Sequence, residues 1–166
     1  RNAVHFLPEY SSAQIHLSEF YIENGDYDKA IAAMKNIEDN GDPEVRSTLG
    51  EIHTKMGNMK KAESYKKQAD QEYRKMLASF EDAFMDHAAE FYMGSGADYK
   101  FAMNLAMKNL ENRKSQRAYL LALEATKLAQ NTKALCSLVQ AIEQTKVTHQ
   151  ELKDNWSLSK KQCQVN

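Results

Sequence analysis

The chain is poor in the residues on which all-β and disulfide-rich folds depend. Its 166 residues include two prolines, six glycines and two cysteines. Turns in an all-β domain use more glycine and proline, and a disulfide framework needs more cysteine pairs. No apolar run approaches the roughly 20 residues that a membrane-spanning helix requires. These shortages argue against an all-β fold, a disulfide scaffold and insertion into a membrane.

What is abundant points to helices. Ala, Leu, Met, Lys, Glu and Gln dominate the sequence, and these residues have high helix propensity. The 22 Lys and Arg residues are balanced by 23 Asp and Glu residues, so no overall charge attracts the chain to nucleic acid or to an anionic membrane. The length suits one compact domain or a short repeat array with a sizeable core. We therefore expect an all-α protein.

The two cysteines are not expected to pair. Cys136 lies in an apolar helical stretch, whereas Cys163 lies in the polar C-terminal segment SKKQCQVN, which we expect to fray. Unpaired thiols slightly favour a reducing, cytoplasmic compartment, although the compartment stays open. The sequence begins at Arg1 and shows no apolar segment typical of a signal peptide. We expect it to be processed or to be part of a longer protein.

One eight-residue motif recurs along the chain. ENGDYDKA is followed by KMGNMKKA and SGADYKFA, and more weakly by AQNTKA. The four copies end at alanines separated by about 32, 40 and 32 residues, a period typical of helical solenoids: Ala30, Ala62, Ala102 and Ala134. A large residue, a small residue and an aromatic residue precede the first copy at Leu17, Ser18 and Tyr21. This spacing places a stripe on one helix face and predicts a helix–turn–helix hairpin in each copy.

The turns have the residues that such hairpins need. Gly25 and Gly57 can adopt the left-handed conformation that ends a helix. Asp26, Asn58 and Asp98 then stand where a side-chain oxygen can cap the following helix. In the fourth copy, Ala129 replaces the turn glycine. No Pro or Gly occurs from Asn58 to Phe80, which predicts one helix extended by about two turns.

At these residues the chain resembles the tetratricopeptide repeat family, over about residues 9–146. The resemblance implies an all-α, right-handed α-solenoid of four antiparallel helix hairpins with a C-terminal capping helix that covers the open end. Pro8 stands where a unit of this family usually closes. The expected segments are a remnant of a preceding repeat at 1–8, units at about 9–42, 43–80, 81–114 and 115–147, and a capping helix with a frayed tail at 148–166.

Two His-x-x-Glu pairs are the most attractive candidates for chemistry. His16 with Glu19, and His87 with Glu90, each share a helix face and could offer two metal ligands. A metal site needs three or four convergent ligands, and these pairs lie on separate hairpins. The sequence contains no phosphate-binding loop, nucleophile elbow, CxxC or HExxH motif. We expect no metal, no cofactor and no enzymatic activity within the chain.

A basic cluster in the second hairpin could suggest nucleic-acid binding. Such a site would need exposed aromatic side chains among the basic ones, but Tyr65 and Tyr73 fall on the apolar stripe. Acidic residues also dilute the cluster, so we expect a solvated outer face and no nucleic-acid partner. The basic residues are Lys60, Lys61, Lys66, Lys67, Arg74 and Lys75.

The resemblance also implies a binding groove. In this family the first helix of each hairpin lines a concave surface that faces the ligand. The corresponding residues here are acidic with an apolar floor, which favours a protein or peptide carrying a basic amphipathic segment. The expected groove residues are Ile15, Glu19, Ile22, Glu23, Glu51, Thr54, Asp86, Glu90, Met93, Tyr119 and Leu123.

Two functional hypotheses follow from this groove. In the first, the chain is a non-catalytic scaffold or adaptor that binds a peptide or helix. In the alternative, it is a structural spacer or self-association element of a larger protein, in which the groove is idle and a homo-oligomer is possible. A catalytic domain elsewhere in a longer protein would be compatible with both hypotheses.

Overall fold

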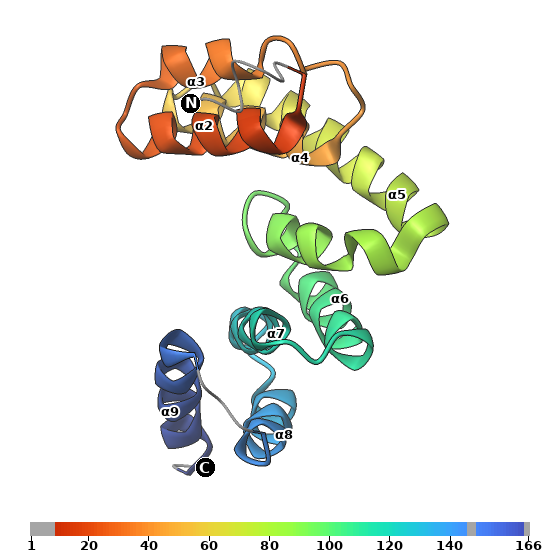
Figure 1. The fold of residues 1–166 in the computed structure, drawn as a ribbon, viewed down its shortest axis with the longest axis vertical. Coiled ribbons are helices and arrows are strands. Elements are labelled where there is room, and N and C mark those ends of the chain that lie inside the picture. The colour runs from red at the N-terminus through yellow and green to blue at the C-terminus, as the bar shows by residue number, and fades with distance from the viewer. Residues whose placement is uncertain (1–8, 146–148, 165–166) are drawn as a thin grey trace. The chain divides into compact units, whose positions relative to one another are not determined.

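The computed structural model describes residues 9–145 and 149–164, and within these ranges all regular structure is α-helical (Figure 1). The predicted all-α fold is thereby confirmed. The chain divides into two compact units, unit 1 at Arg1–Ser79 and unit 2 at Phe80–Asn166, which are described separately. Residues 1–8, expected to be a remnant of a preceding repeat, lie outside the described ranges.

From residue 9 onward, unit 1 contains three helices and the first part of a fourth. They are α2 (Ser11–Glu23), α3 (Tyr27–Met34), α4 (Pro43–Lys55) and α5 (Met59–Met93). Helix α2 packs along α3, and α4 contacts both. Their apolar faces form one core, against which Tyr21, Ile22, Tyr27, Ile31 and Tyr65 also pack: Ile15, Ala30, Met34, Ile37, Val45, Leu49 and Ile52.

Helix α5 is interrupted at Phe80, the first residue of unit 2. The backbone of Phe80 has φ −143° and ψ 49°, which are not helical values. The helical run from Met59 to Ser79 therefore ends where the sequence predicted the end of one long helix. The part of α5 after Phe80 belongs to unit 2.

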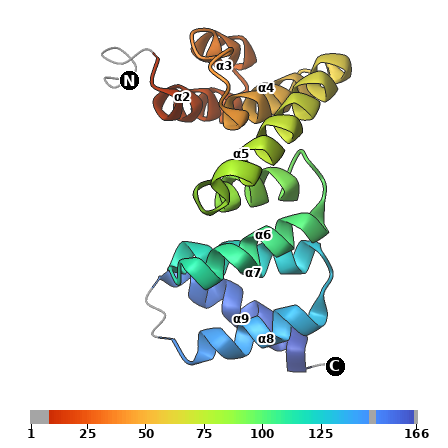
Figure 2. The same ribbon diagram turned by 90° about the vertical axis from the view of Figure 1, so that its right-hand side faces the viewer.

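In the described part of unit 2, four further helices follow. They are α6 (Tyr99–Asn112), α7 (Gln116–Leu128), α8 (Thr132–Glu143) and α9 (Gln150–Gln164). Helix α6 packs along α7, and α9 packs against both α7 and α8 (Figure 2). The expected C-terminal capping helix is therefore present as α9. Helix α5 spans the predicted boundary between the second and third repeat units, close to its interruption at Phe80, and the unit boundaries stay predictions.

Most of the predicted helix caps form. Gly25 and Gly57 have φ 75°, the left-handed conformation that ends a helix without a Cβ clash. Asn58 accepts a hydrogen bond from the Lys61 backbone at 3.3 Å, and Asp98 accepts one from Phe101 at 3.1 Å. The cap predicted at Asp26 was wrong, because its carboxylate accepts a hydrogen bond from the Lys29 side chain instead.

Small residues lie where the helices of each hairpin approach most closely. Ser18 and Ala30 are fully buried, and the Ser18 hydroxyl donates a hydrogen bond to the Ala30 carbonyl at 3.2 Å. In the next hairpin, a Cβ at Gly50 would lie 3.5 Å from the carbonyl oxygen of Ala62. Both pairs are separated by 12 residues, as the repeat predicted.

The register predicted for the fourth hairpin is wrong by one residue. Asn131 caps α8, and the buried residue four positions later is Leu135, as Ala30 follows Asp26 by four. Ala134, the predicted anchor, is only half-buried. The left-handed residue of this turn is Gln130, with φ 54°, rather than the position of Ala129. The error arose because no glycine marks the turn.

Cys136 and Cys163 form a disulfide bond, so the prediction that they stay unpaired was wrong. Cys136 lies on α8 and Cys163 lies on α9. The segment expected to fray is helical through Gln164, and this continuation carries Cys163 to the side of α8. The argument for a reducing compartment from unpaired thiols therefore fails.

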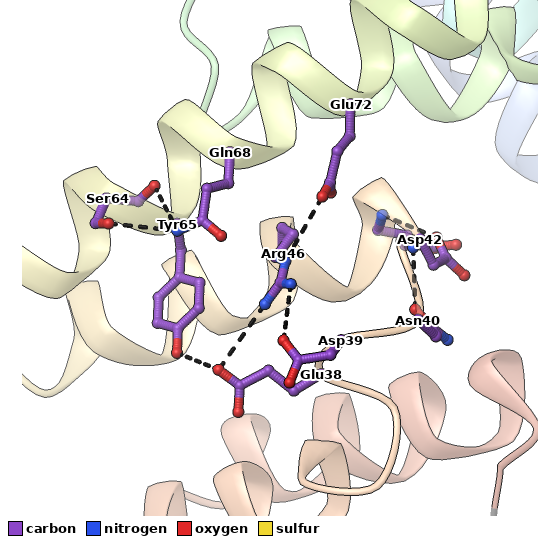
Figure 3. Close-up of polar contacts among 10 residues, drawn as sticks. Glu38, Asp39, Asn40, Asp42, Arg46, Ser64, Tyr65, Gln68 and Glu72 are labelled. Atoms are coloured by element: carbon purple, nitrogen blue, oxygen red, sulfur yellow. Dashed lines mark hydrogen bonds and ion pairs between the residues drawn. The ribbon is translucent and has the colours of Figure 1, made fainter.

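A polar network fixes the loop between α3 and α4 to α5 (Figure 3). The Tyr65 hydroxyl donates a hydrogen bond of 2.6 Å to Glu38. The Arg46 guanidinium, whose side chain is 12% exposed, lies 3.1 Å from Asp39, 3.8 Å from Glu38 and 3.7 Å from Glu72. Burial and the hydrogen bond to the charged Glu38 raise the pKa of Tyr65 to about 12.

His53 of α4 is buried against the same network. Its ring stacks on that of Tyr65, with the centroids 5.5 Å apart and the planes at 6°. Burial, aided by the positive charge of Lys61, lowers the pKa of His53, and Glu38 opposes this shift. Neutral His53 is therefore the form that the folded state favours.

Enlarging a seam residue should destabilise the fold. Leu at position 30 or 62 would force the paired helices apart, because Ala30 and Ala62 have no exposed surface. We expect Ala30→Leu and Ala62→Leu each to lower the free energy of unfolding by about 1–3 kcal/mol in urea titrations followed by circular dichroism. Lys60→Ala, at an exposed position, should change it by less than about 0.5 kcal/mol. Identical stabilities for all three variants would contradict the assigned seam.

Acidification should weaken unit 1 through His53. The pKa of this residue is lowered in the folded chain, whereas in the unfolded chain it is about 6.5. Its contribution to stability is therefore complete above about pH 6.5 and is lost as pH falls through the folded-state pKa. Urea unfolding between about pH 7.5 and 5.5 should show this loss, and His53→Phe, which keeps an aromatic ring there, should reduce it. His149→Gln, at an exposed position, is the control, and equal pH slopes for His53→Phe and wild type would refute the assignment.

Candidate functional site

The first half of the expected groove lies on the neighbouring helices α2 and α4 of unit 1. Glu19 and Glu23 of α2 and Glu51 of α4 are exposed. Ile22 of α2 and Thr54 of α4 are half-buried. We call these five residues, with Phe20 described next, the α2–α4 face.

Phe20 belongs to this face but was missed from the sequence. Phe20 lies between Glu19 and Glu23 in the sequence, and it is 51% exposed. Its ring meets that of Tyr21 edge-on, with the centroids 5.8 Å apart. The exposure of Phe20 could have been predicted from the sequence, because Phe20 is an aromatic residue next to the buried stripe. Tyr21, and not Phe20, keeps the spacing of the core residues. An exposed aromatic ring offers both apolar contact and an electron-rich face for a cation.

Ile15, predicted to line the floor of the groove, is instead part of the core of unit 1. Its side chain is only 1% exposed and packs within the cluster that joins α2, α3 and α4. The periodicity places Ile15 on the stripe that other helices cover, so its side chain is not presented on the α2–α4 face.

The acidic groups of the α2–α4 face differ in their partners. Glu19 Oε2 lies 2.8 Å from His16 Nδ1 in an exposed pair. Neither Glu23 nor Glu51 has a hydrogen-bond or ion-pair partner among residues 9–145 and 149–164. The Thr54 hydroxyl donates to the Gly50 carbonyl of its own helix at 2.8 Å. Two carboxylates of this face are therefore open to a ligand.

The acidic groove residues of unit 2 have basic partners within the unit. Glu90 lies 2.9 Å from Arg117, and Asp86 lies 3.8 Å from Arg113. Met93 is half-buried at the end of α5. These ion pairs reduce the negative potential that the sequence predicted for this part of the groove.

On α7, the register error changes the assignment of groove residues. Leu123 has no exposed surface and precedes Leu135 by 12 residues, as Ser18 precedes Ala30, so it occupies the seam between helices. Glu124 is exposed in its place. Tyr119 is half-buried. Burial lowers the pKa of Lys127, and the negative charge of Glu124 opposes this shift. The N-cap residue Asn131 was the sequence signal that would have given the correct register.

The described residues offer no recognisable metal site. Nowhere in residues 9–145 and 149–164 are three His, Cys, Asp or Glu side chains grouped so that they could hold a metal ion. Within the same ranges, no helix has both the length and the apolar character needed to cross a membrane.

The comparisons agree with the hairpin architecture. The family model of the tetratricopeptide repeat matches residues 21–79, which extend from the end of α2 through α3, α4 and the first part of α5. The comparison with curated proteins gave no match. Members of this family generally mediate protein–protein interactions and are generally non-catalytic. Over residues 21–79, the chain is similar to the tetratricopeptide repeat family.

Proposed function

We propose that the chain is a non-catalytic protein-interaction module whose α2–α4 face binds a basic amphipathic segment of a partner protein. The observation that carries this proposal is the pair of open carboxylates, Glu23 and Glu51, on two neighbouring helices. The match to a family that generally mediates protein–protein interactions supports the same class of function.

The chemistry of the face defines the kind of partner. Glu23 and Glu51 attract Lys or Arg side chains, and Phe20 can take a cation over its ring or an apolar side chain beside it. Ile22 adds a partly buried apolar surface. A segment with basic residues along one edge of an apolar face satisfies both requirements. Because the carboxylates are solvated, each ion pair is partly screened, and we expect micromolar affinity that weakens with salt.

Unit 1 is the part of the chain that we expect to bind most of the basic segment. A basic segment binding at Asp86 or Glu90 would have to displace Arg113 or Arg117 from them. Exchanging one exposed ion pair for another contributes little free energy. The carboxylates of Glu23 and Glu51 have no such competitor among the described residues, so they supply the larger share of the attraction.

The test uses a fluorescent helical peptide with Leu and Lys at spacings of three and four residues, and its binding is followed by anisotropy. We expect the double charge reversal Glu23→Lys and Glu51→Lys to weaken binding by about tenfold or more. Phe20→Ser should also weaken binding, because it removes the apolar contact. Neither change should alter the melting temperature much, because all three side chains are exposed.

Matched variants separate this face from overall charge. Glu63→Lys reverses an exposed carboxylate on α5, outside the α2–α4 face, and should leave the affinity within about twofold. Glu90→Lys should have a smaller effect than Glu51→Lys, because Arg117 already neutralises Glu90. The proposal fails if the double reversal leaves the affinity unchanged, or if the peptide with Glu in place of Lys binds equally well.

A further inference from the structure

We infer that α9 is a redox-releasable cover: the Cys136–Cys163 disulfide holds it on α7 and α8, and reduction of that bond frees it. The disulfide joins α8 to α9 across 27 residues of sequence. Helix α9 contacts both α7 and α8, and the bond fastens it near its C-terminal end. Whether α9 stays docked then depends on what remains once the covalent link is broken.

Few apolar side chains of α9 itself are buried in its contacts with α7 and α8. Of its 15 residues, Leu152 and Ser159 are the buried ones, and Trp156 is half-buried. Docking a helix restricts the backbone of every residue in it, and apolar burial is the main force that offsets this loss of entropy. One buried Leu and one partly covered Trp provide little apolar burial for a helix of this length.

The packing between α8 and α9 is also incomplete. A pocket of about 360 Å³ at this junction is open to solvent, so water reaches the edge of the packing between α8 and α9. The residues lining it are Ile142, Glu143, Thr145, Lys153, Trp156 and Ser157.

The remaining contacts of α9 are polar and replaceable by water. Trp156 Nε1 donates to the Val139 carbonyl at 3.1 Å, and Lys127 Nζ donates to Asn155 at 3.3 Å. Lys160 pairs with Glu143 in an exposed ion pair. Hydrogen bonds and ion pairs that exchange with water contribute little net stability, so they do not replace the covalent link.

The release requires a dithiol reductant, and both sulfur atoms belong to half-buried residues. A thiolate of the reductant attacks one sulfur of the Cys136–Cys163 bond, which breaks and leaves a mixed disulfide. The second thiol of the reductant resolves the mixed disulfide and closes a disulfide within the reductant. Two electrons pass to the chain, and Cys136 and Cys163 each end with one proton as thiols.

Trp156 makes this step observable, because it is the sole tryptophan of the chain. In the full chain treated with a dithiol reductant, the emission of Trp156 should shift to longer wavelength as its ring enters water. Hydrogen exchange of the amides of residues 150–164 should accelerate by about 100-fold or more, since the loop-closure constraint is lost. Amides of α6 and α7 should keep their protection, because those two helices pack along each other.

Variants distinguish the release of α9 from a general loss of structure in unit 2. Cys163→Ser should show the shifted emission and rapid exchange of α9 without reductant, and should not respond to reductant. Gln162→Ser changes an exposed neighbour, keeps the disulfide and should behave as wild type. Unchanged Trp156 emission and α9 exchange after reduction would overturn the inference, since the non-covalent contacts would then suffice. Loss of protection throughout α6 and α7 would also overturn it, because the bond would then hold the whole unit together.

Discussion

The close approach of two helices within each hairpin is the constraint on which the rest of this structure depends. Ser18 with Ala30, and Gly50 with Ala62, stand 12 residues apart at fully covered positions, and their small side chains let the backbones come near each other. Larger residues can then pack on either side, as Leu49 and Ile52 do. Because the same spacing recurs, the first two hairpins have similar stripes of buried residues, as a repeat fold requires.

This packing also decides which side chains remain exposed on the α2–α4 face. The stripe directed into the core takes Ile15, which is why an apolar residue assigned to the groove is unavailable there. The positions between stripes keep Glu19, Phe20 and Glu23 in solvent. The face that remains is acidic and includes an exposed aromatic ring, and its character follows from which residues the core does not need.

Local signals predicted the helices, and distant contacts supplied most of what could not be predicted. Periodicity, the turn glycines and Asn58 were enough to locate the hairpins of unit 1, because caps and stripes depend on residues a few positions apart. The fourth turn was predicted one residue too early, at Ala129. The residue type of Gln130 does not predict the left-handed conformation that it adopts. The disulfide was missed because Cys163 becomes a partner of Cys136 only once α9 is known to continue and to pack on α8.

The ion pairs of unit 2 show why the charge of a groove is difficult to infer from its own residues. Glu81, Asp86 and Glu90 each pair with a basic residue 27 positions later: Lys108, Arg113 and Arg117. The basic partners lie on α6, at its C-cap and on α7, so these pairs could be predicted from the sequence only with the packing of these elements known.

Exposed pairs of this kind contribute about 0–1 kcal/mol each, so their main effect is not on stability. Their consequence is electrostatic, since they neutralise carboxylates that would otherwise attract a cationic partner. Unit 1 lacks equivalent basic partners for Glu23 and Glu51 among its described residues, so these two carboxylates keep their negative potential. The presence of acidic residues is thus a weaker guide to a binding surface than the absence of partners for them.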